Sequence, residues 1–133
     1  MVSKKTLGCK GESFVLDKLK TKGYLLYKKN FIKWGIELDL IVYKYIPEKK
    51  MLDIRVVEVK TRSLYEFNLA NFKLDRKWYR LIGYLFDIKD VVTGSVDYPV
   101  KYSEIHFDLA LVKSGQGNDL IMCSYIDDIN LLF

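Results

Sequence analysis

Two short segments of this 133-residue chain place charged residues among residues that favour β-strands. One leucine separates Glu37 from Asp39, and one valine separates Glu58 from Lys60. Side chains two positions apart in a strand point to the same face of a sheet. If the two strands are neighbours, an acidic cluster and a lysine lie inside a hydrophobic sheet. Burying such charges is costly unless a partner or a cation compensates them, so the pattern predicts a divalent metal site.

Such a site suits the hydrolysis of a phosphodiester. The reaction needs an activated water, a neutralised phosphate charge and a stabilised leaving oxygen, and one or two Mg²⁺ ions serve all three needs. Mg²⁺ prefers oxygen ligands; Asp39 and Glu58 would supply carboxylates and Val59 a backbone carbonyl. Lys60 would orient the attacking water or stabilise charge on the phosphate. The alternative is a buried ion pair without catalytic chemistry.

The composition is that of a globular protein with a substantial core. Half of the residues are hydrophobic and 14% are aromatic, and the length fits a single domain over residues 1–133. No apolar run is long enough to span a bilayer, and residues 1–5 lead into no apolar signal-peptide core. We therefore expect a cytoplasmic protein that does not engage a membrane. Two cysteines without metal-ligand spacing argue against a zinc site or a disulfide framework.

The chain is basic, with a net charge of +5. Lysines are densest in the first third of the sequence, and a second basic group follows residue 72. A positive surface beside an acidic pocket suits a polyanionic substrate that approaches a metal. A lysine-rich solvated surface explains the charge equally well.

The remaining pattern predicts an α/β fold. Apolar spacing and turn residues indicate a helix from Ser3 or Leu7 to Lys22, with Gly23 as its terminator. A turn at residues 47–50 joins two antiparallel strands, and residues 91–100 are expected to form a loop or an irregular strand. We expect a second helix over residues 68–87 and strands over residues 24–32, 37–45, 52–61, 105–111 and 120–126. This order suits a mixed sheet flanked by helices.

The charged segments also resemble a known nuclease motif. Asp39 followed by Glu58-Val59-Lys60 resembles the core of the PD-(D/E)xK nuclease superfamily. Together with Gly8 to Glu12, Lys22-Gly23-Tyr24, Asn30, Glu37 to Ile41 and Val57 to Arg62, it resembles the YraN-type family of predicted endonucleases. That family is similar to archaeal Holliday-junction resolvases. The resemblance spans nearly the whole chain.

The resemblance implies a fold, a cofactor and residue roles. The fold would be a restriction-endonuclease-like α/β/α sandwich, in which an antiparallel hairpin belongs to a mixed central sheet. Glu12, Asp39 and Glu58 would bind Mg²⁺ or Mn²⁺ together with the Val59 carbonyl, and Lys60 would be the catalytic lysine. Glu37 matches an auxiliary acid of the family. For Glu12 a dipole-stabilised helix residue is the alternative, and for Glu37 it is a salt bridge.

Basic residues around these motifs are candidates for contacts with the DNA backbone. For some of them the alternative is simpler: Arg62 would merely end a strand, and the later cations would form an exposed helix face. The candidates are Lys10, Lys33, Arg62, Lys73, Lys77 and Arg80.

The sequence thus favours a metal-dependent endonuclease that acts on DNA, with branched or otherwise structured DNA among its candidate substrates. A non-catalytic nucleic-acid-binding module with the same fold is the second hypothesis, since it needs only the basic surface. A third is an interaction protein whose apolar tail, residues 126–133, packs on a partner or on a second copy. Related resolvases act as dimers, so a homodimer is one expectation.

Overall fold

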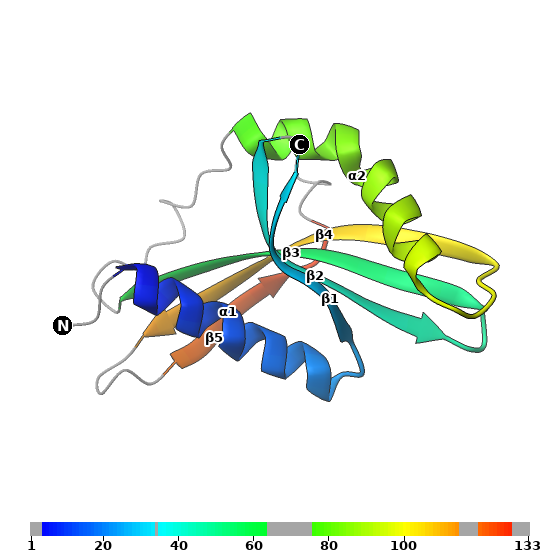
Figure 1. Cartoon of the computed structure of the whole chain (residues 1–133). Coiled ribbons are helices and arrows are strands. Elements are labelled where there is room, and N and C mark those ends of the chain that lie inside the picture. Colours follow the sequence, from blue (N-terminus) through cyan, green and yellow to red (C-terminus); the bar gives the residue numbers. More distant parts are fainter. Residues whose placement is uncertain (1–3, 34, 64–75, 115–119, 129–133) are drawn as a thin grey trace.

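In the computed structural model, residues 4–33, 35–63, 76–114 and 120–128 are described, and they form a five-stranded sheet with two α-helices (Figure 1). The strands lie in chain order across the sheet, β3 pairs with β4 in parallel, and the other neighbours are antiparallel. The predicted α/β class with a mixed sheet is therefore confirmed. The elements are α1 (Lys4–Thr21), β1 (Leu25–Lys33), β2 (Ile36–Ile46), β3 (Met51–Ser63), α2 (Arg76–Ser95), β4 (Tyr102–Ser114) and β5 (Leu120–Ile126).

Local signals in the sequence explain where several elements end. Gly23 follows α1 with a φ of 94°, a conformation that costs glycine little. Its N–H donates to the Lys20 carbonyl, and the Tyr24 N–H donates to the Leu19 carbonyl, which closes the helix. The turn at residues 47–50 joins β2 to β3 as an antiparallel hairpin, as predicted. β3 then lies in the middle of the sheet, between β2 and β4.

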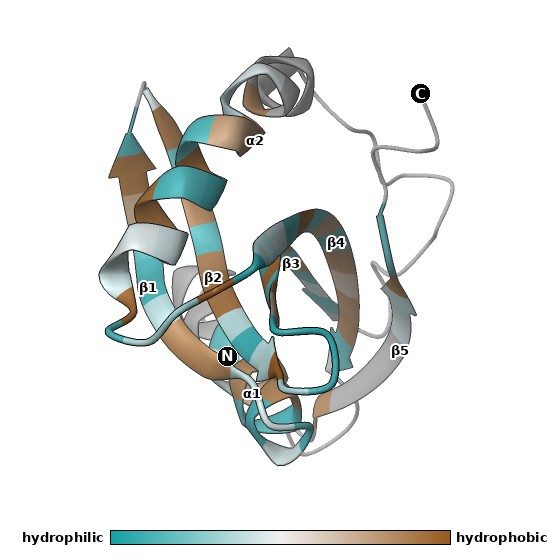
Figure 2. Cartoon of the chain, turned by 90° about the vertical axis from the view of Figure 1, so that its right-hand side faces the viewer, coloured by the Kyte–Doolittle hydropathy of each residue, from teal (hydrophilic) through white to brown (hydrophobic). Residues whose placement is uncertain are grey.

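The sheet separates two hydrophobic cores. In Figure 2, α2 lies on one side of the strands and α1 on the other, with hydrophobic residues recurring along β2, β3 and β4 between them. Leu81, Leu85, Ile88 and Val92 of α2 pack on one side with residues such as Ile54, Val56 and Phe107. On the other side, Val15, Leu16 and Leu19 of α1 pack with Leu40, Val42, Val57, Val59, Ala110 and Val112. The helices thereby hold the central strands from both faces.

The second helix differs from its prediction. It continues to Ser95, so the expected loop or irregular strand is wrong for residues 91–95. The reason lies in the apolar stripe, because Ile88 and Val92 continue it by four residues and both are buried against the sheet. Gly94, which suggested a loop, has open space around it and is tolerated in the last turn. The expected start of this helix, residues 68–75, lies outside the described residues.

Neither of the two described helices combines the length and hydrophobicity needed to cross a membrane.

Candidate active site

The candidate site lies where β2 and β3 part. Their pairing ends at Leu40 and Val57. Beyond it the start of β2 pairs with β1 and the end of β3 pairs with β4, so the sheet opens as a strand fork (Figure 1). Asp39 and Glu58 are the first residues past the last pair, one on each strand. The Val59 N–H donates to Asp39 Oδ2 at 2.9 Å, so a carboxylate occupies the opening of the fork.

Glu58 and Lys60 lie together on β3, as their spacing predicted. Lys60 Nζ is 3.3 Å from Glu58 Oε1. Glu58 is only 4% exposed, whereas the Lys60 side chain is 26% exposed. A buried carboxylate keeps its charge more easily beside an ammonium group. The pair therefore presents a positively charged group at the edge of the fork and holds it there through a buried anion.

An unusually close contact brings α1 to the fork. A Cβ on Gly11 would lie 1.9 Å from Thr61 Oγ1, which is too close for any side chain, and 3.1 Å from Thr61 Cβ, which is a tight contact. Only glycine at this position lets the helix approach β3 so closely. The next residue of α1 is Glu12, which is thereby carried to the strands.

Glu12 meets Asp39 in a position that disfavours two negative charges. Burial, and then the charge of Asp39, raise the pKa of Glu12 to about 7, although Lys29 acts in the opposite direction. Glu37 adds a smaller repulsion. Glu12 Oε2 is buried and has no hydrogen-bond partner among the residues that the structure describes. Below about pH 7 Glu12 keeps its proton, which a hydrogen bond with Asp39 favours. Above it the two carboxylates repel each other, and a cation between them would relieve that repulsion.

Two side chains of the fork, Glu12 and Asp39, suit a hard divalent cation. Glu12 and Asp39 would hold it, because their oxygens are the ligands that Mg²⁺ and Mn²⁺ prefer and Glu12 Oε2 is free to bind. Glu58 and the Val59 carbonyl, also predicted as ligands, lie on the opposite strand of the fork. Among the residues that the structure describes, no three His, Cys, Asp or Glu side chains are grouped so as to hold a metal ion. Glu12 and Asp39 thus supply two ligands, which is fewer than a complete metal-binding site needs.

The predicted nucleic-acid contacts fall into two groups. Lys10 and Lys33 are exposed near the fork, on the residue before Gly11 and at the end of β1. Arg62 is half-buried, and its Nη1 donates to the Thr61 carbonyl at 2.9 Å. Lys77 and Arg80 belong to α2, but their side chains lie outside the described part of the chain, as does the whole of Lys73.

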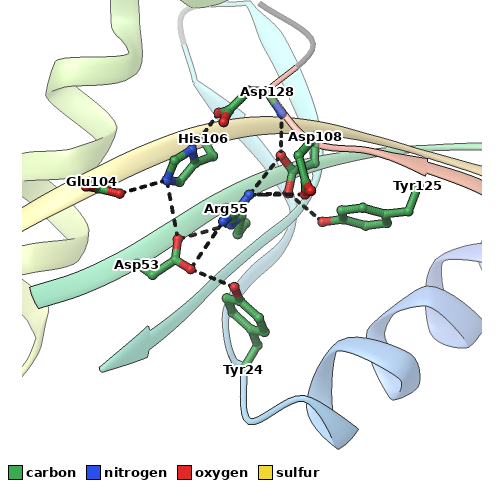
Figure 3. Close-up of polar contacts among 9 residues, drawn as sticks. Tyr24, Asp53, Arg55, Glu104, His106, Asp108, Tyr125 and Asp128 are labelled. Carbon is green, nitrogen blue, oxygen red and sulfur yellow. Dashed lines mark hydrogen bonds and ion pairs between the residues drawn. The ribbon is translucent and has the colours of Figure 1, made fainter. Parts of the chain in front are cut away.

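The structure also contains a second charged cluster, which the sequence reasoning missed (Figure 3). Arg55 of β3 is at its centre: Nε lies 3.0 Å from Asp53 Oδ1, and Nη1 lies 3.3 Å from Asp108 Oδ2. Tyr24 donates to Asp53 at 2.7 Å, and Tyr125 donates to Asp108 at 2.6 Å. We call these five residues the Arg55 network.

The network is satisfied around its most buried member. Asp108 is fully buried, and burial raises its pKa, which the hydrogen bonds from Tyr125 and the Asp128 N–H and the charge of Arg55 oppose. Burial lowers the pKa of Arg55, but the attraction of Asp108 and Asp53 outweighs it, so the guanidinium stays charged. Burial and the bond to Asp53 raise the pKa of Tyr24 to about 12. Arg55 therefore keeps its charge and Tyr24 keeps the proton that it donates to Asp53.

Part of this network was visible in the sequence. Asp53 and Arg55 alternate with apolar residues, as do His106 and Asp108, in the same way as the fork residues. Their spacing alone did not indicate which strands would be neighbours. His106 is half-buried; it contacts Asp128 through Nδ1 and Glu104 through Nε2.

Comparison with known proteins places the chain in a group without an established activity. The family model described as uncharacterised protein family UPF0102 matches residues 11–110, which include every residue of the fork from Gly11 to Arg62. A UPF0102 protein of Caldanaerobacter subterraneus subsp. tengcongensis is 42% identical over 76 residues. That match covers 56% of this chain and 56% of the relative, little more than half of each.

Proposed function

This chain belongs to UPF0102, the YraN-like uncharacterised protein family, and from this membership and the strand fork we propose that it is a metal-dependent endonuclease that hydrolyses phosphodiester bonds of DNA. Family membership indicates a nuclease-like protein. The finer assignment depends mainly on one observation: Glu12 and Asp39 bring two carboxyl groups together in the opening of a sheet, and Glu12 Oε2 has no hydrogen-bond partner in the described part of the chain. A bound cation would neutralise this pair and offset its unfavourable energy, which supports a metal-binding role for the fork.

In this proposal Asp39 and Glu12 hold the cation, which supplies charge neutralisation and a more acidic water when bound. Lys60 lies 3.3 Å from Glu58, which holds its ammonium group beside the opening where the scissile phosphate would bind. There the ammonium donates to a phosphate oxygen and stabilises the charge that develops during attack. The water oxygen would form the new bond to phosphorus and release a proton to solvent, while the bond to the leaving sugar oxygen breaks and that oxygen takes up a proton from solvent. The restriction-endonuclease-like sandwich is part of the same proposal.

The basic residues near the fork would bind the backbone of the substrate. Lys10 and Lys33 are exposed and Arg62 is half-buried near the opening, where they would contact phosphates on either side of the cleaved bond. Structured or branched DNA and a homodimeric enzyme belong to the proposal through the similarity of YraN-type proteins to junction resolvases.

One observation favours a second candidate, a non-catalytic nucleic-acid-binding module. In the described part of the chain the three predicted acidic ligands are not gathered around one point. Binding to the phosphate backbone needs only the lysines and would fall steeply with salt.

A cleavage assay separates the two candidates. Purified protein would be incubated with linear, flap and four-way-junction DNA in Mg²⁺ or Mn²⁺. We expect Lys60→Ala and Asp39→Asn to lower the cleavage rate by roughly a hundredfold or more. Asp39→Asn is the sharper variant, because its amide oxygen still accepts the Val59 N–H while the charge is lost. Lys20→Ala, an exposed lysine of α1 away from the predicted residues, is the matched control.

Two results would count against the nuclease. Metal-dependent cutting that persists in both Lys60→Ala and Asp39→Asn would remove the proposed site. Salt-dependent binding without nicking of any substrate in either metal would favour the non-catalytic module.

A further inference from the structure

A second surface lies at the other end of the hairpin, away from the fork. An open groove of about 810 Å³ runs between the β2–β3 turn and the segment that leads into β4. The Lys101 N–H donates to the Lys50 carbonyl at 2.8 Å and joins the two walls. We call it the hairpin groove. The residues that matter for its chemistry are Tyr45, Glu48, Lys49, Lys50, Lys101 and Tyr102.

The groove is positively charged. Lys49, Lys50 and Lys101 are all exposed, and Glu48 is the one acidic residue among those that line it. Three ammonium groups on two adjacent segments repel one another, and a polyanion that lies between them would relieve that repulsion. The charge therefore indicates an anionic ligand that is long enough to reach both walls.

Two tyrosine rings define what kind of anion fits. Tyr102 lines the groove and is 43% exposed, a large aromatic surface left in water. Tyr45 lines the same groove, and its ring meets that of Tyr98 edge-on, with 5.1 Å between centroids and an interplanar angle of 66°. That contact holds the Tyr45 ring in one orientation. Aromatic rings interleaved with lysines match a ligand that alternates phosphates with flat bases.

We propose that the hairpin groove binds single-stranded nucleic acid, with bases against Tyr102 and Tyr45 and the backbone along the three lysines. The groove is distinct from the fork, because Met51 at the start of β3 and Glu58 at the fork are seven residues apart, roughly 23 Å along a strand. It extends the proposed function by a second contact with nucleic acid. This inference rests on the proposed function only in taking nucleic acid as the partner, and it does not depend on the cleavage chemistry.

Binding would be measured by fluorescence anisotropy in EDTA, with a fluorescein-labelled oligothymidylate and a duplex of matched length as probes. Tyr102→Ala is expected to raise the Kd for the single strand fivefold or more, since a stacked base contributes about 1–3 kcal/mol. Its Kd for the duplex should change less than about twofold. Lys101→Ala should reduce the slope of log Kd against log salt by about 0.7. Tyr102→Phe should bind like the wild type, because it keeps the ring.

The matched controls locate the effect. Lys20→Ala removes one exposed lysine elsewhere and should leave single-strand binding within about twofold of the wild type. Glu48→Gln removes the opposing charge and should tighten binding. Lys49→Ala, at an exposed turn position, tests the same surface if Tyr102→Ala does not fold. The assay contains EDTA and measures binding alone, so a failure of the proposed cleavage chemistry would not be mistaken for a failure of the groove.

Three outcomes would overturn the proposal. In the first, folded Tyr102→Ala binds the single strand as tightly as the wild type. In the second, it loses single-strand and duplex binding equally. In the third, a polyglutamate of matched charge binds as tightly as the oligothymidylate, which would mean that the lysines act without base stacking.

Discussion

Two charged clusters lie three residues apart along β3, and they are built in opposite ways. Around Arg55 the acidic groups share a cation, and two tyrosines donate to the carboxylates. At the fork, Glu12 lies beside Asp39, one of its oxygens has no hydrogen-bond partner among the described residues, and its pKa is raised to about 7. The hydrogen bonds and ion pairs of the first cluster suit a structural network, and the second cluster is where we propose that a cation binds. Both clusters contain buried charged groups, so the presence of such groups does not distinguish them. What distinguishes them is whether each group has bonding partners.

The two clusters also differ in what surrounds them. The Arg55 network lies where β3 and β4 are paired, so the backbone leaves no room between the strands. The fork lies where β2 has left β3, and a side chain accepts the hydrogen bond that a strand would otherwise take. An opening in a sheet exposes backbone and side-chain groups that a ligand would otherwise not reach. The Arg55 network can therefore stabilise the sheet that positions the fork residues.

The largest effect should come from Arg55→Ala. This change leaves Asp108 fully buried without its cation, so we expect the free energy of unfolding to fall by about 3–5 kcal/mol. Urea denaturation followed by circular dichroism would measure it. Asp127→Asn is the control, because Asp127 also lies 3.3 Å from Arg55 but its side chain is 68% exposed. Its effect should stay below about 1 kcal/mol. Equal effects of the two changes would break the comparison.

An intermediate effect is expected from Gly11→Ala. The new methyl group would overlap Thr61 Oγ1, push α1 from β3 and destabilise the protein by about 1–3 kcal/mol. Adding Thr61→Ala removes the Oγ1 and Cγ2 atoms of Thr61 and should restore most of the lost stability. Gly83→Ala in α2 is the matched control, because nothing lies within 4 Å of a Cβ there. It should be neutral or stabilising. If Gly11→Ala behaved like Gly83→Ala, the close approach of α1 would not matter for stability.

The smallest effect, and the one of opposite sign, should come from Glu12→Gln in EDTA. The pKa of Glu12 is about 7 in the folded protein and 4.5 ordinarily, so the folded state holds its proton more tightly. Stability that depends on this group is therefore lost as the pH rises from about 4.5 to 7. At pH 8 Glu12→Gln should stabilise the protein by roughly 1–2 kcal/mol, and the gain should shrink at pH 5.

Thermal unfolding at both pH values measures this effect. Adding Mn²⁺ gives a more specific test of the same carboxylate pair. The wild type at pH 8 should gain thermal stability when Mn²⁺ is added, whereas Glu12→Gln should gain less, because it lacks one of the two carboxylates. A destabilising Glu12→Gln at pH 8 would mean that the carboxylate is well partnered, and the contrast between the two clusters would be lost.

Much of the fold could be predicted because its signals are local. Alternating apolar residues marked β2, β3 and β4, and the turn at residues 47–50 marked the hairpin. Gly23 marked the end of α1 because its role depends only on backbone conformation. The end of α2 was missed because the open surroundings of Gly94 are a tertiary property. The Arg55 network was missed for the same reason, since Tyr24, Asp108 and Tyr125 join it from three other parts of the chain.

The sequence by itself determined which residues share a strand face, because side-chain direction in a strand follows from the two-residue repeat. It therefore placed Glu58 beside Lys60 and proposed that Asp39 lies near them. Only the tertiary structure decided that β2 leaves β3 at Asp39, that Gly11 lets α1 approach Thr61, and that Glu12 meets Asp39 as a result. These contacts join residues far apart in the chain, and they depend on the bending and packing of whole elements, which no local pattern encodes.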